Sequence, residues 1–220
     1  MSRLWALLLG SSCAACAQPG AENSAICADC RDRARRSPAV AGAVLPDSDG
    51  FDRMVRTFKR GVVRELGGEL AALTLDRWRC GQLDLPPPDL LDLITWVPHA
   101  RVRAAKRGCH APEIFARALG ARLSLPCQPL LTRCTEAPQR GRDIAGRREH
   151  AHRAFTLAKH GSSNDLVQPG MRALVIDDVR TTGATLDACC ELLQKLGLVT
   201  HQLAVVAVPR HTQKRGGGRV

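Results

Sequence analysis

The chain of 220 residues is poor in aromatic side chains: they make up 3% of it, and tyrosine is absent. Because single-stranded nucleic acid is commonly held by bases that stack on aromatic rings, this scarcity argues against a row of stacking platforms. An apolar run of membrane-spanning length is also missing, and residues 4–9 are too short for the core of a signal peptide. We therefore expect a cytoplasmic protein without membrane insertion, beginning with a short amphipathic or buried helix.

Acidic residues are in the minority, and the formal net charge is +11. The excess is local, since residues 101–153 hold twelve Arg or Lys against four Asp or Glu, and the last twelve residues hold four against none. Such a distribution indicates an anionic partner, which could be pyrophosphate, a nucleotide or a nucleic acid backbone. With 45% hydrophobic residues, the chain can build one sizeable core.

Four of the ten cysteines form two Cys-x-x-Cys pairs near the amino terminus, at Cys13, Cys16, Cys27 and Cys30. This spacing is typical of a structural zinc site, because four thiolates can surround one tetrahedral ion. Disulfide bonds and a thioredoxin-like redox pair are the alternatives. The first is disfavoured inside a reducing cell, and the second needs a βαβ context that this segment lacks. We expect zinc.

A strand, two carboxylates and a loop follow one another in residues 174–185, Leu-Val-Ile-Asp-Asp-Val-Arg-Thr-Thr-Gly-Ala-Thr. The branched apolar residues suit a parallel sheet covered on both faces. We expect the strand to end where Asp177 and Asp178 emerge at its solvated carboxyl edge, the edge at which open α/β sheets bind ligands. These carboxylates can accept hydrogen bonds from the diol of a ribose and hold hydrated Mg²⁺. An acidic strand end without a function is the alternative.

The loop after the carboxylates suits a phosphate group. It offers hydroxyl donors and residues small enough for a close backbone approach, namely Thr181, Thr182, Gly183, Ala184 and Thr185. Apolar residues at helical spacing follow, so a helix is expected to begin near Thr185 with its N–H groups directed at the loop. A Walker-type lysine is missing, which argues against a nucleoside triphosphate.

Residues 175–185 resemble the phosphoribosyl-pyrophosphate (PRPP) signature of type I phosphoribosyltransferases. Further resemblance narrows this to the ComF family, which is associated with competence and DNA uptake. The family pattern is matched at Val97-Pro98, Arg107-Gly108, Gln139, Gly141, Arg147 and Ala154-Phe155, besides the cysteine pairs. The chain departs from that pattern at His110 and His150, where the family has asparagine, and also at Cys109, Ala111 and Arg142, where it has phenylalanine, glutamine and leucine.

The resemblance implies an α/β fold of the type I phosphoribosyltransferase kind, a parallel sheet with flanking helices, and a small N-terminal zinc-binding domain. It also implies a transferase that binds PRPP with Mg²⁺ and transfers a pentosyl group. Pyrophosphate would lie on a basic loop containing Arg101, Arg103, Lys106 and Arg107, and a flexible hood would bring Arg147 to the site. A surface loop without a ligand is the alternative for these cations. A second function, single-stranded DNA binding in competence without transferase turnover, is also compatible with the charge.

The whole chain is expected to divide into three parts. Residues 1–45 form an N-terminal helix and the zinc ribbon, residues 46–209 form the phosphoribosyltransferase-like domain, and residues 210–220 form a basic disordered tail. Residues 31–50 are interpreted as a linker, followed from Phe51 by helix interrupted near Gly61 and near residues 67–68. Strands are expected at 93–98 as the first of the core, 123–131, 154–159 and 200–209, and a helix from Pro112.

Overall fold

The computed structural model describes residues 12–19, 24–46, 51–59, 65–99, 110–134, 154–158 and 167–208. Some predictions concern residues outside these ranges. They are the amino-terminal helix, the basic loop, the hood and the basic tail, with the site residues Arg101, Arg103, Lys106, Arg107 and Arg147 and the departure at His150. These stay predictions, as does the division into three domains.

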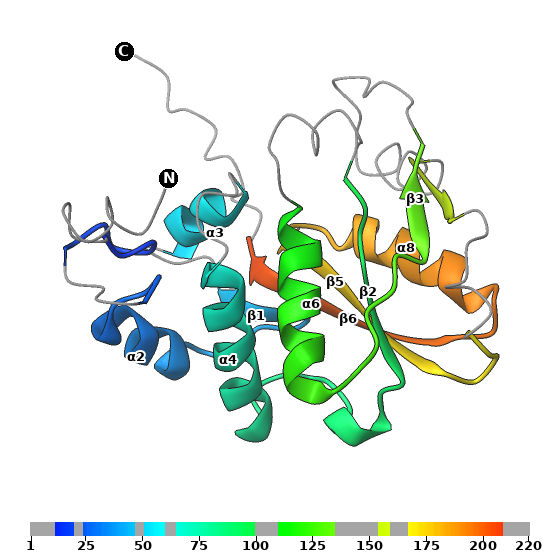
Figure 1. Ribbon diagram of the computed structural model, residues 1–220, viewed down its shortest axis with the longest axis horizontal. Helices are drawn as coiled ribbons and strands as arrows, with labels where there is room; N and C mark the ends of the chain where they lie inside the picture. The colour runs from blue at the N-terminus through cyan, green and yellow to red at the C-terminus, as the bar shows by residue number, and fades with distance from the viewer. Residues whose placement is uncertain are drawn as a thin grey trace, which may run out of the picture.

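A parallel sheet lies at the centre of the described structure, with the strand order β1-β6-β5-β2 (Figure 1). Its strands are β1 (Ala43–Pro46), β2 (Leu93–Trp96), β5 (Arg172–Arg180) and β6 (Val199–Ala207). The pairings of β1 with β6, of β6 with β5 and of β5 with β2 are all parallel. The parallel α/β sheet predicted from the sequence is confirmed.

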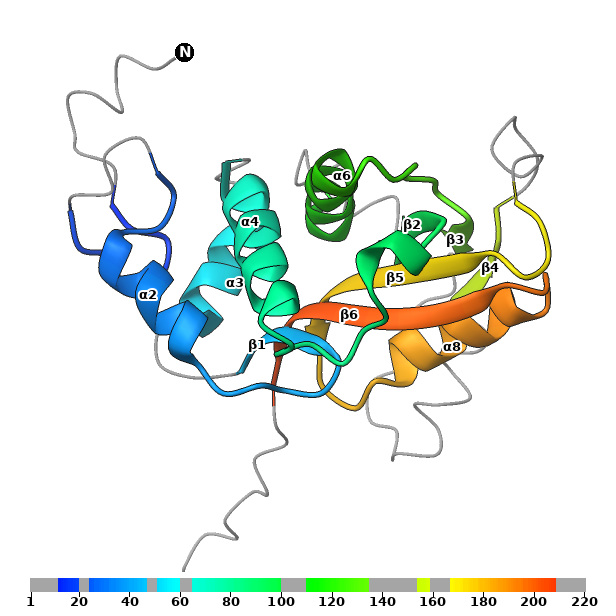
Figure 2. The same cartoon turned by 90° about the horizontal axis from the view of Figure 1, so that it is seen from below.

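Helices cover both faces of this sheet (Figure 2). α8 (Ala184–Gln194) lies on one face, and α3 (Phe51–Lys59), α4 (Glu65–Arg79) and α6 (Ala111–Leu123) lie on the other. Leu174 and Ile176 of β5 are buried in the core that includes residues of α4 and α6, whereas Ala173 and Val175 are buried in the core that includes α8. Because both faces are covered, the strand has an unbroken run of apolar residues.

A smaller antiparallel sheet pairs β3 (Leu131–Arg133) with β4 (Phe155–Leu157). β4 confirms the strand expected at 154–159. The strand expected at 123–131 is wrong for most of its length, because α6 continues to Leu123 and β3 begins only at Leu131. Two prolines in the intervening stretch, Pro126 and Pro129, have no N–H to donate to a strand ladder.

The prediction of a linker at residues 31–50 is wrong for residues 31–36, which are helical, and for residues 43–46, which form a strand. α2 (Ala28–Arg36) begins before it, and β1 lies inside it as an edge strand of the sheet. Ala43, Val44 and Leu45 are fully buried, and β1 pairs with β6 through Ala43 and Ala204. The strand is short and ends in proline, so its sequence resembles an extended linker. It also means that the strand at 93–96 is not the first of the sheet.

The helix break expected at residues 67–68 is also wrong, because both glycines lie inside α4. A Cβ atom at Gly67 would come within 2.6 Å of the Ile114 side chain on α6. The glycine is therefore explained by the close approach of two helices, and the packing between them offsets the low helix propensity of glycine.

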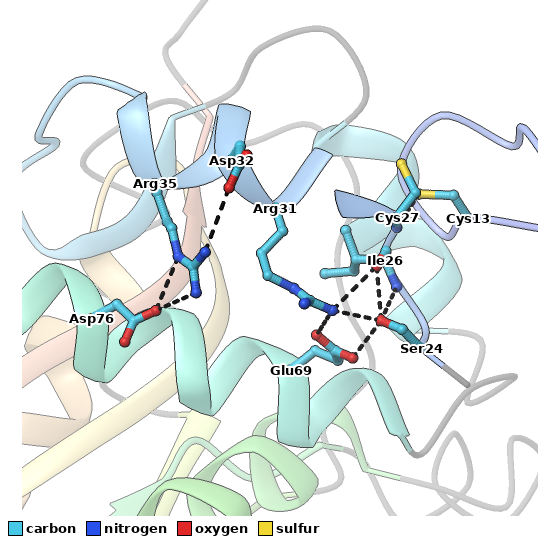
Figure 3. Close-up of polar contacts among 9 residues, drawn as sticks. All are labelled: Cys13, Ser24, Ile26, Cys27, Arg31, Asp32, Arg35, Glu69 and Asp76. Carbon is cyan, nitrogen blue, oxygen red and sulfur yellow. Dashed lines mark hydrogen bonds and ion pairs between the residues drawn. The ribbon is translucent and has the colours of Figure 1, made fainter. Parts of the chain in front are cut away.

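Polar contacts hold α2 and the cysteine-bearing segment against α4 (Figure 3). Arg31 pairs with Glu69 at 2.9 Å, and the Ser24 hydroxyl donates to the same carboxylate at 2.6 Å. One turn further along, Arg35 pairs with Asp76 at 2.8 Å. Partly exposed pairs of this kind contribute at most about 1 kcal/mol each, so they orient the two helices more than they stabilise them.

Arg77 makes a stronger connection between the same helices. Its side chain is 1% exposed, and its guanidinium donates to main-chain oxygens at the end of α2: Ala34 at 2.7 Å, Ser37 at 2.9 Å and Pro38 at 3.0 Å. These bonds satisfy carbonyl groups that a helix leaves without partners at its carboxyl end. Burial lowers the pKa of this arginine from its usual value.

We expect Arg77→Met to lower the free energy of unfolding by roughly 3 kcal/mol, because the substitution keeps most of the volume but removes a buried donor to three main-chain carbonyls. Urea denaturation would measure the change. Arg79→Met, at an exposed position of the same helix, is the control and should change stability little. Equal effects of the two substitutions would contradict the role given to Arg77.

Candidate metal centre and phosphate loop

The sulfur atoms of Cys13, Cys16, Cys27 and Cys30 all lie within 4.8 Å of one another. Cys27 directly precedes α2 and Cys30 lies in its first turn, so the helix orients the second pair. The Cys16 and Cys27 sulfurs are 3.8 Å apart, which is too long for a disulfide bond of about 2.05 Å. It matches the edge of about 3.8 Å expected between thiolates around a tetrahedral zinc ion. The predicted cysteine cluster is confirmed, and it could hold a zinc ion.

The thiols of the cluster differ in their acidity. Burial acts to raise the pKa of Cys13, but main-chain hydrogen bonds from Cys16, Cys27 and Ala15 outweigh it and lower that pKa to about 6. Burial, followed by the neighbouring sulfurs of Cys27 and Cys16, raises the pKa of Cys30. Four thiolates this close repel one another, so a cation at their centre would fit the donor set.

We expect purified protein to contain close to one zinc ion per chain. Cys16→Ser should lose most of it, because removing one thiolate opens a closed four-ligand site. Elemental analysis measures the zinc, and Cys80→Ser, an exposed cysteine outside the cluster, is the control. A folded wild-type protein that contains no metal would contradict the zinc site.

The two carboxylates of the central strand lie inside it, not at its end. β5 continues to Arg180, and the register pairs Asp177 with Ala204 and Arg180 with Ala207 of β6. Asp177 is 6% exposed and Asp178 is 5% exposed. The expectation that they emerge at a solvated edge is therefore wrong. The reason is that β6 runs alongside past both residues, so its hydrogen bonds extend the strand.

Asp177 and Asp178 are neighbours in a strand, so their side chains point to opposite faces of the sheet. On the α8 side, Asp177 adds to the effect of burial in raising the pKa of Cys189. Its Oδ1 also accepts a hydrogen bond from the Asp178 N–H at 2.8 Å. On the other side, Asp178 Oδ2 lies 3.7 Å from His99 Nε2. The pair thus presents acceptors on both sides of the strand.

The phosphate loop follows at once, and α8 begins at Ala184 as expected. Gly183 precedes the helix with a φ of 81°, a left-handed conformation that favours glycine. Thr181 and Thr182 are exposed, and the Thr182 hydroxyl accepts from the Ala184 N–H at 3.3 Å. The Ala184 N–H therefore lies beside a threonine hydroxyl at the start of a helix, and the N–H groups of a first helical turn suit an anion.

Arg180, the last residue of β5, directly precedes this loop and was not predicted as a site residue. Its Nη1 donates to the Ala41 main-chain oxygen at 3.0 Å, and a side chain at Gly42 would overlap the guanidinium. Its Nε lies 3.3 Å from the position that a Cβ of Gly183 would occupy. The segment at 41–42, interpreted from sequence as linker, therefore contacts Arg180 beside the phosphate loop. The sequence offered one sign of this contact, the presence of a positively charged residue, Arg180, inside the PRPP-like signature at 175–185.

His110, where the ComF pattern has asparagine, directly precedes α6 at its N-cap position. Its Nδ1 lies 3.2 Å from the Glu113 N–H, and its Nε2 lies 2.8 Å from the His99 N–H. A neutral imidazole accepts a hydrogen bond at only one nitrogen, and the shorter contact, from His99, is the better bond. Burial, followed by the neighbouring His99 ring, lowers the pKa of His110 to about 4.

This pKa gives His110 a pH-dependent effect on stability. The folded protein holds His110 neutral, so His110 does not lower the free energy of unfolding above pH 6.5, its ordinary pKa. As pH falls from 6.5 towards about 4, the unfolded chain binds a proton that the folded protein does not, and the free energy of unfolding decreases. We expect His110→Asn to cap α6 through its side-chain oxygen and to remove this part of the pH dependence. Urea denaturation at a series of pH values would test it. Parallel stability curves for wild type and variant over that range would contradict it.

The fold and the two sites define an α/β protein with a central parallel sheet, flanking helices and an amino-terminal four-cysteine cluster, as predicted. No family model matches the chain. The chain is 33% identical over 137 residues to Competence protein F of Haemophilus influenzae, which confirms the predicted resemblance to the ComF family. This match covers 61% of the chain and 56% of the relative, so the chain spans about half the length of that protein.

The solved structures to which the chain is similar include adenine phosphoribosyltransferases. One is adenine phosphoribosyl transferase from Trypanosoma brucei in complex with AMP, pyrophosphate and ribose-5-phosphate, with 13% identity, a TM-score of 0.41, and 81% of this chain and 67% of that chain covered. Another is adenine phosphoribosyltransferase from Saccharomyces cerevisiae, with 15% identity, a TM-score of 0.39, and coverage of 65% and 69%. These TM-scores are low, so the fold class rests on the strand order and register of the chain itself. Within the ranges that the structure describes, no helix is both long and apolar enough to cross a membrane.

Proposed function

We propose that the chain is a phosphoribosyltransferase-like protein of the ComF family that binds PRPP with Mg²⁺ and holds or transfers its 5-phosphoribosyl group. The observation that carries the proposal is the juxtaposition of two buried carboxylates, Asp177 and Asp178, with a phosphate-sized loop at the start of α8. A ribose 5-phosphate carries a diol, which needs hydrogen-bond acceptors, and a phosphate, which needs hydrogen-bond donors.

Each part of the ligand has a proposed partner. Asp177 and Asp178 accept hydrogen bonds from the ribose hydroxyls. The 5-phosphate lies on the loop formed by Thr181, Thr182, Gly183, Ala184 and Thr185. The diphosphate faces the basic loop with Arg101, Arg103, Lys106 and Arg107, and Arg147 completes the site from the hood. These last five residues are proposed from the sequence resemblance alone.

Mg²⁺ fits the donor set because it prefers oxygen ligands and is usually held by one or two carboxylates together with substrate oxygens. When bound, it would neutralise charge on the diphosphate. In a transfer, the bond between C1 of the ribose and pyrophosphate breaks, and pyrophosphate leaves with the electron pair. A nucleophile, usually nitrogen, then forms its bond to C1 and loses a proton. The cations of the basic loop would stabilise the charge that develops on the leaving group.

A second candidate is favoured by the similarity to Competence protein F and by the net charge of +11. In it, the basic middle segment and tail hold single-stranded DNA during uptake, without transferase turnover. The electrostatic contacts would be to phosphate groups and insensitive to sequence. The two candidates are compatible, because the phosphate loop at 181–185 can hold a phosphoribosyl group while the surface of the hood binds DNA.

The two halves of the proposed site should fail in different ways. Asp177→Asn with Asp178→Asn keeps the volume but removes the charges that recognise the diol and Mg²⁺, so PRPP affinity should fall about a hundredfold or more and lose its Mg²⁺ dependence. Binding of inorganic phosphate should stay. Gly183→Val should weaken PRPP, ribose 5-phosphate and inorganic phosphate together, because it places a side chain in the loop. Calorimetric titration measures all three.

Both substitutions need a check of folding, since the carboxylates are buried and Gly183 has a positive φ. Gly170→Val is the matched control, because Gly170 has a φ of 89° but no heavy atom within 4 Å of an added Cβ. It should reproduce the backbone strain and leave ligand binding unchanged. An Asn variant that binds PRPP like wild type, with the same Mg²⁺ dependence, would overturn the proposed function.

A further inference from the structure

His99 lies beside Asp178 although the two residues are far apart in the sequence. β2 ends at Trp96, and the next residue, Val97, still donates to the Ile176 oxygen of β5 at 2.8 Å. The chain therefore continues alongside β5 and brings His99 to the level of the carboxylates. His99 Nε2 lies 3.7 Å from Asp178 Oδ2, with 22% of the histidine side chain and 7% of the aspartate side chain exposed.

The position of His99 is fixed from a second direction. Its N–H donates to His110 Nε2 at 2.8 Å, and the two imidazole rings contact each other edge to face at 4.6 Å between centroids. His110 in turn lies at the start of α6, where Ala111 and Pro112 are buried. A strand end and a helix start thus hold the His99 ring against the carboxylate, and neither can move without disturbing the core.

The distance of 3.7 Å is too long for a hydrogen bond but short enough to become one with a small rotation of either side chain. Contacts of this kind in ligand-free sites are often long and shorten when the ligand is bound. The Nε2–H tautomer and the imidazolium both present a donor towards Asp178, so the contact does not require a charged histidine.

We propose that His99 is a positioning residue for Asp178: by donating from Nε2 to Oδ2, it holds the carboxylate in the orientation in which its remaining acceptor sites meet the ribose diol. The inference rests on the proposed function and adds a source of specificity to it. A buried carboxylate can turn about its last bond, and a fixed donor on one oxygen removes that freedom. His110 supports the arrangement by holding the His99 main chain.

The expected consequence is selectivity for ribose over 2-deoxyribose. A site that presents an oriented acceptor to a hydroxyl group rejects the analogue without that hydroxyl, because a buried acceptor then loses its partner. Without His99 the carboxylate is less well oriented, and this selectivity should fall. Recognition of the phosphate by the loop at 181–185 should not depend on His99.

Calorimetric titration of wild type, His99→Leu and His99→Asn with ribose 5-phosphate, 2-deoxyribose 5-phosphate and inorganic phosphate would test the proposal. His99→Leu fills the space without a donor and should bind ribose 5-phosphate about tenfold more weakly, with a smaller loss for the deoxy sugar and none for phosphate. His99→Asn keeps an N–H donor and should recover much of the lost affinity. His201→Asn is the control and should bind like wild type, because His201 lies near the amino-terminal end of β6, away from the carboxylates.

Equal affinities of wild type and His99→Leu for ribose 5-phosphate would overturn this inference and leave the proposed function standing. So would an equal loss for all three ligands, or a His99→Asn variant as weak as His99→Leu, since either would mean a structural role. Failure of the wild-type protein to bind ribose 5-phosphate would instead overturn the proposed function, and the inference with it.

Discussion

The parallel pairing of β5 with β6 is the constraint on which the rest of the structure depends. Its hydrogen bonds continue past Asp177 and Asp178 to Arg180, so the carboxylates belong to a strand covered on both sides. A carboxylate in a loop can turn to water, whereas one in a central strand keeps the direction that the backbone gives it. The cost of removing two charges from water is therefore accompanied by a fixed geometry, which is what recognition of a diol needs.

The segment from the cysteine cluster to β1 is held at three successive places. Cys27 and Cys30 lie at the start of α2, the guanidinium of Arg77 binds the carbonyls at its end, and Arg180 binds the Ala41 oxygen just before β1. The four-cysteine cluster is thus joined to the sheet by chain that is contacted along its length. The same segment contacts Arg180, the last residue before the phosphate loop, so it joins the cysteine cluster to the strand that leads into that loop.

Much of the fold follows from local sequence patterns. The Leu-Val-Ile run, the start of α8 near Thr185, the cysteine spacing and the strand that ends before Pro98 depend on residues close together in the chain. β1 could not be predicted from local sequence, because the four residues Ala-Val-Leu-Pro form a strand only through their pairing with β6. Gly67 could not be interpreted either, since the helix that it approaches begins over forty residues later. The contact between His99 and Asp178 likewise depends on how two strands align.

The burial of Asp178 shows why the sequence-based expectation failed and what replaces it. Two adjacent acidic residues were expected at the solvated end of a strand, because unpaired charges are rarely found inside proteins. The structure places the His99 imidazole 3.7 Å from Asp178 Oδ2, just beyond the carboxyl end of the neighbouring strand. Parallel strands bring their carboxyl ends to one edge, so residues that follow β2 and residues that end β5 meet there whatever their separation in sequence.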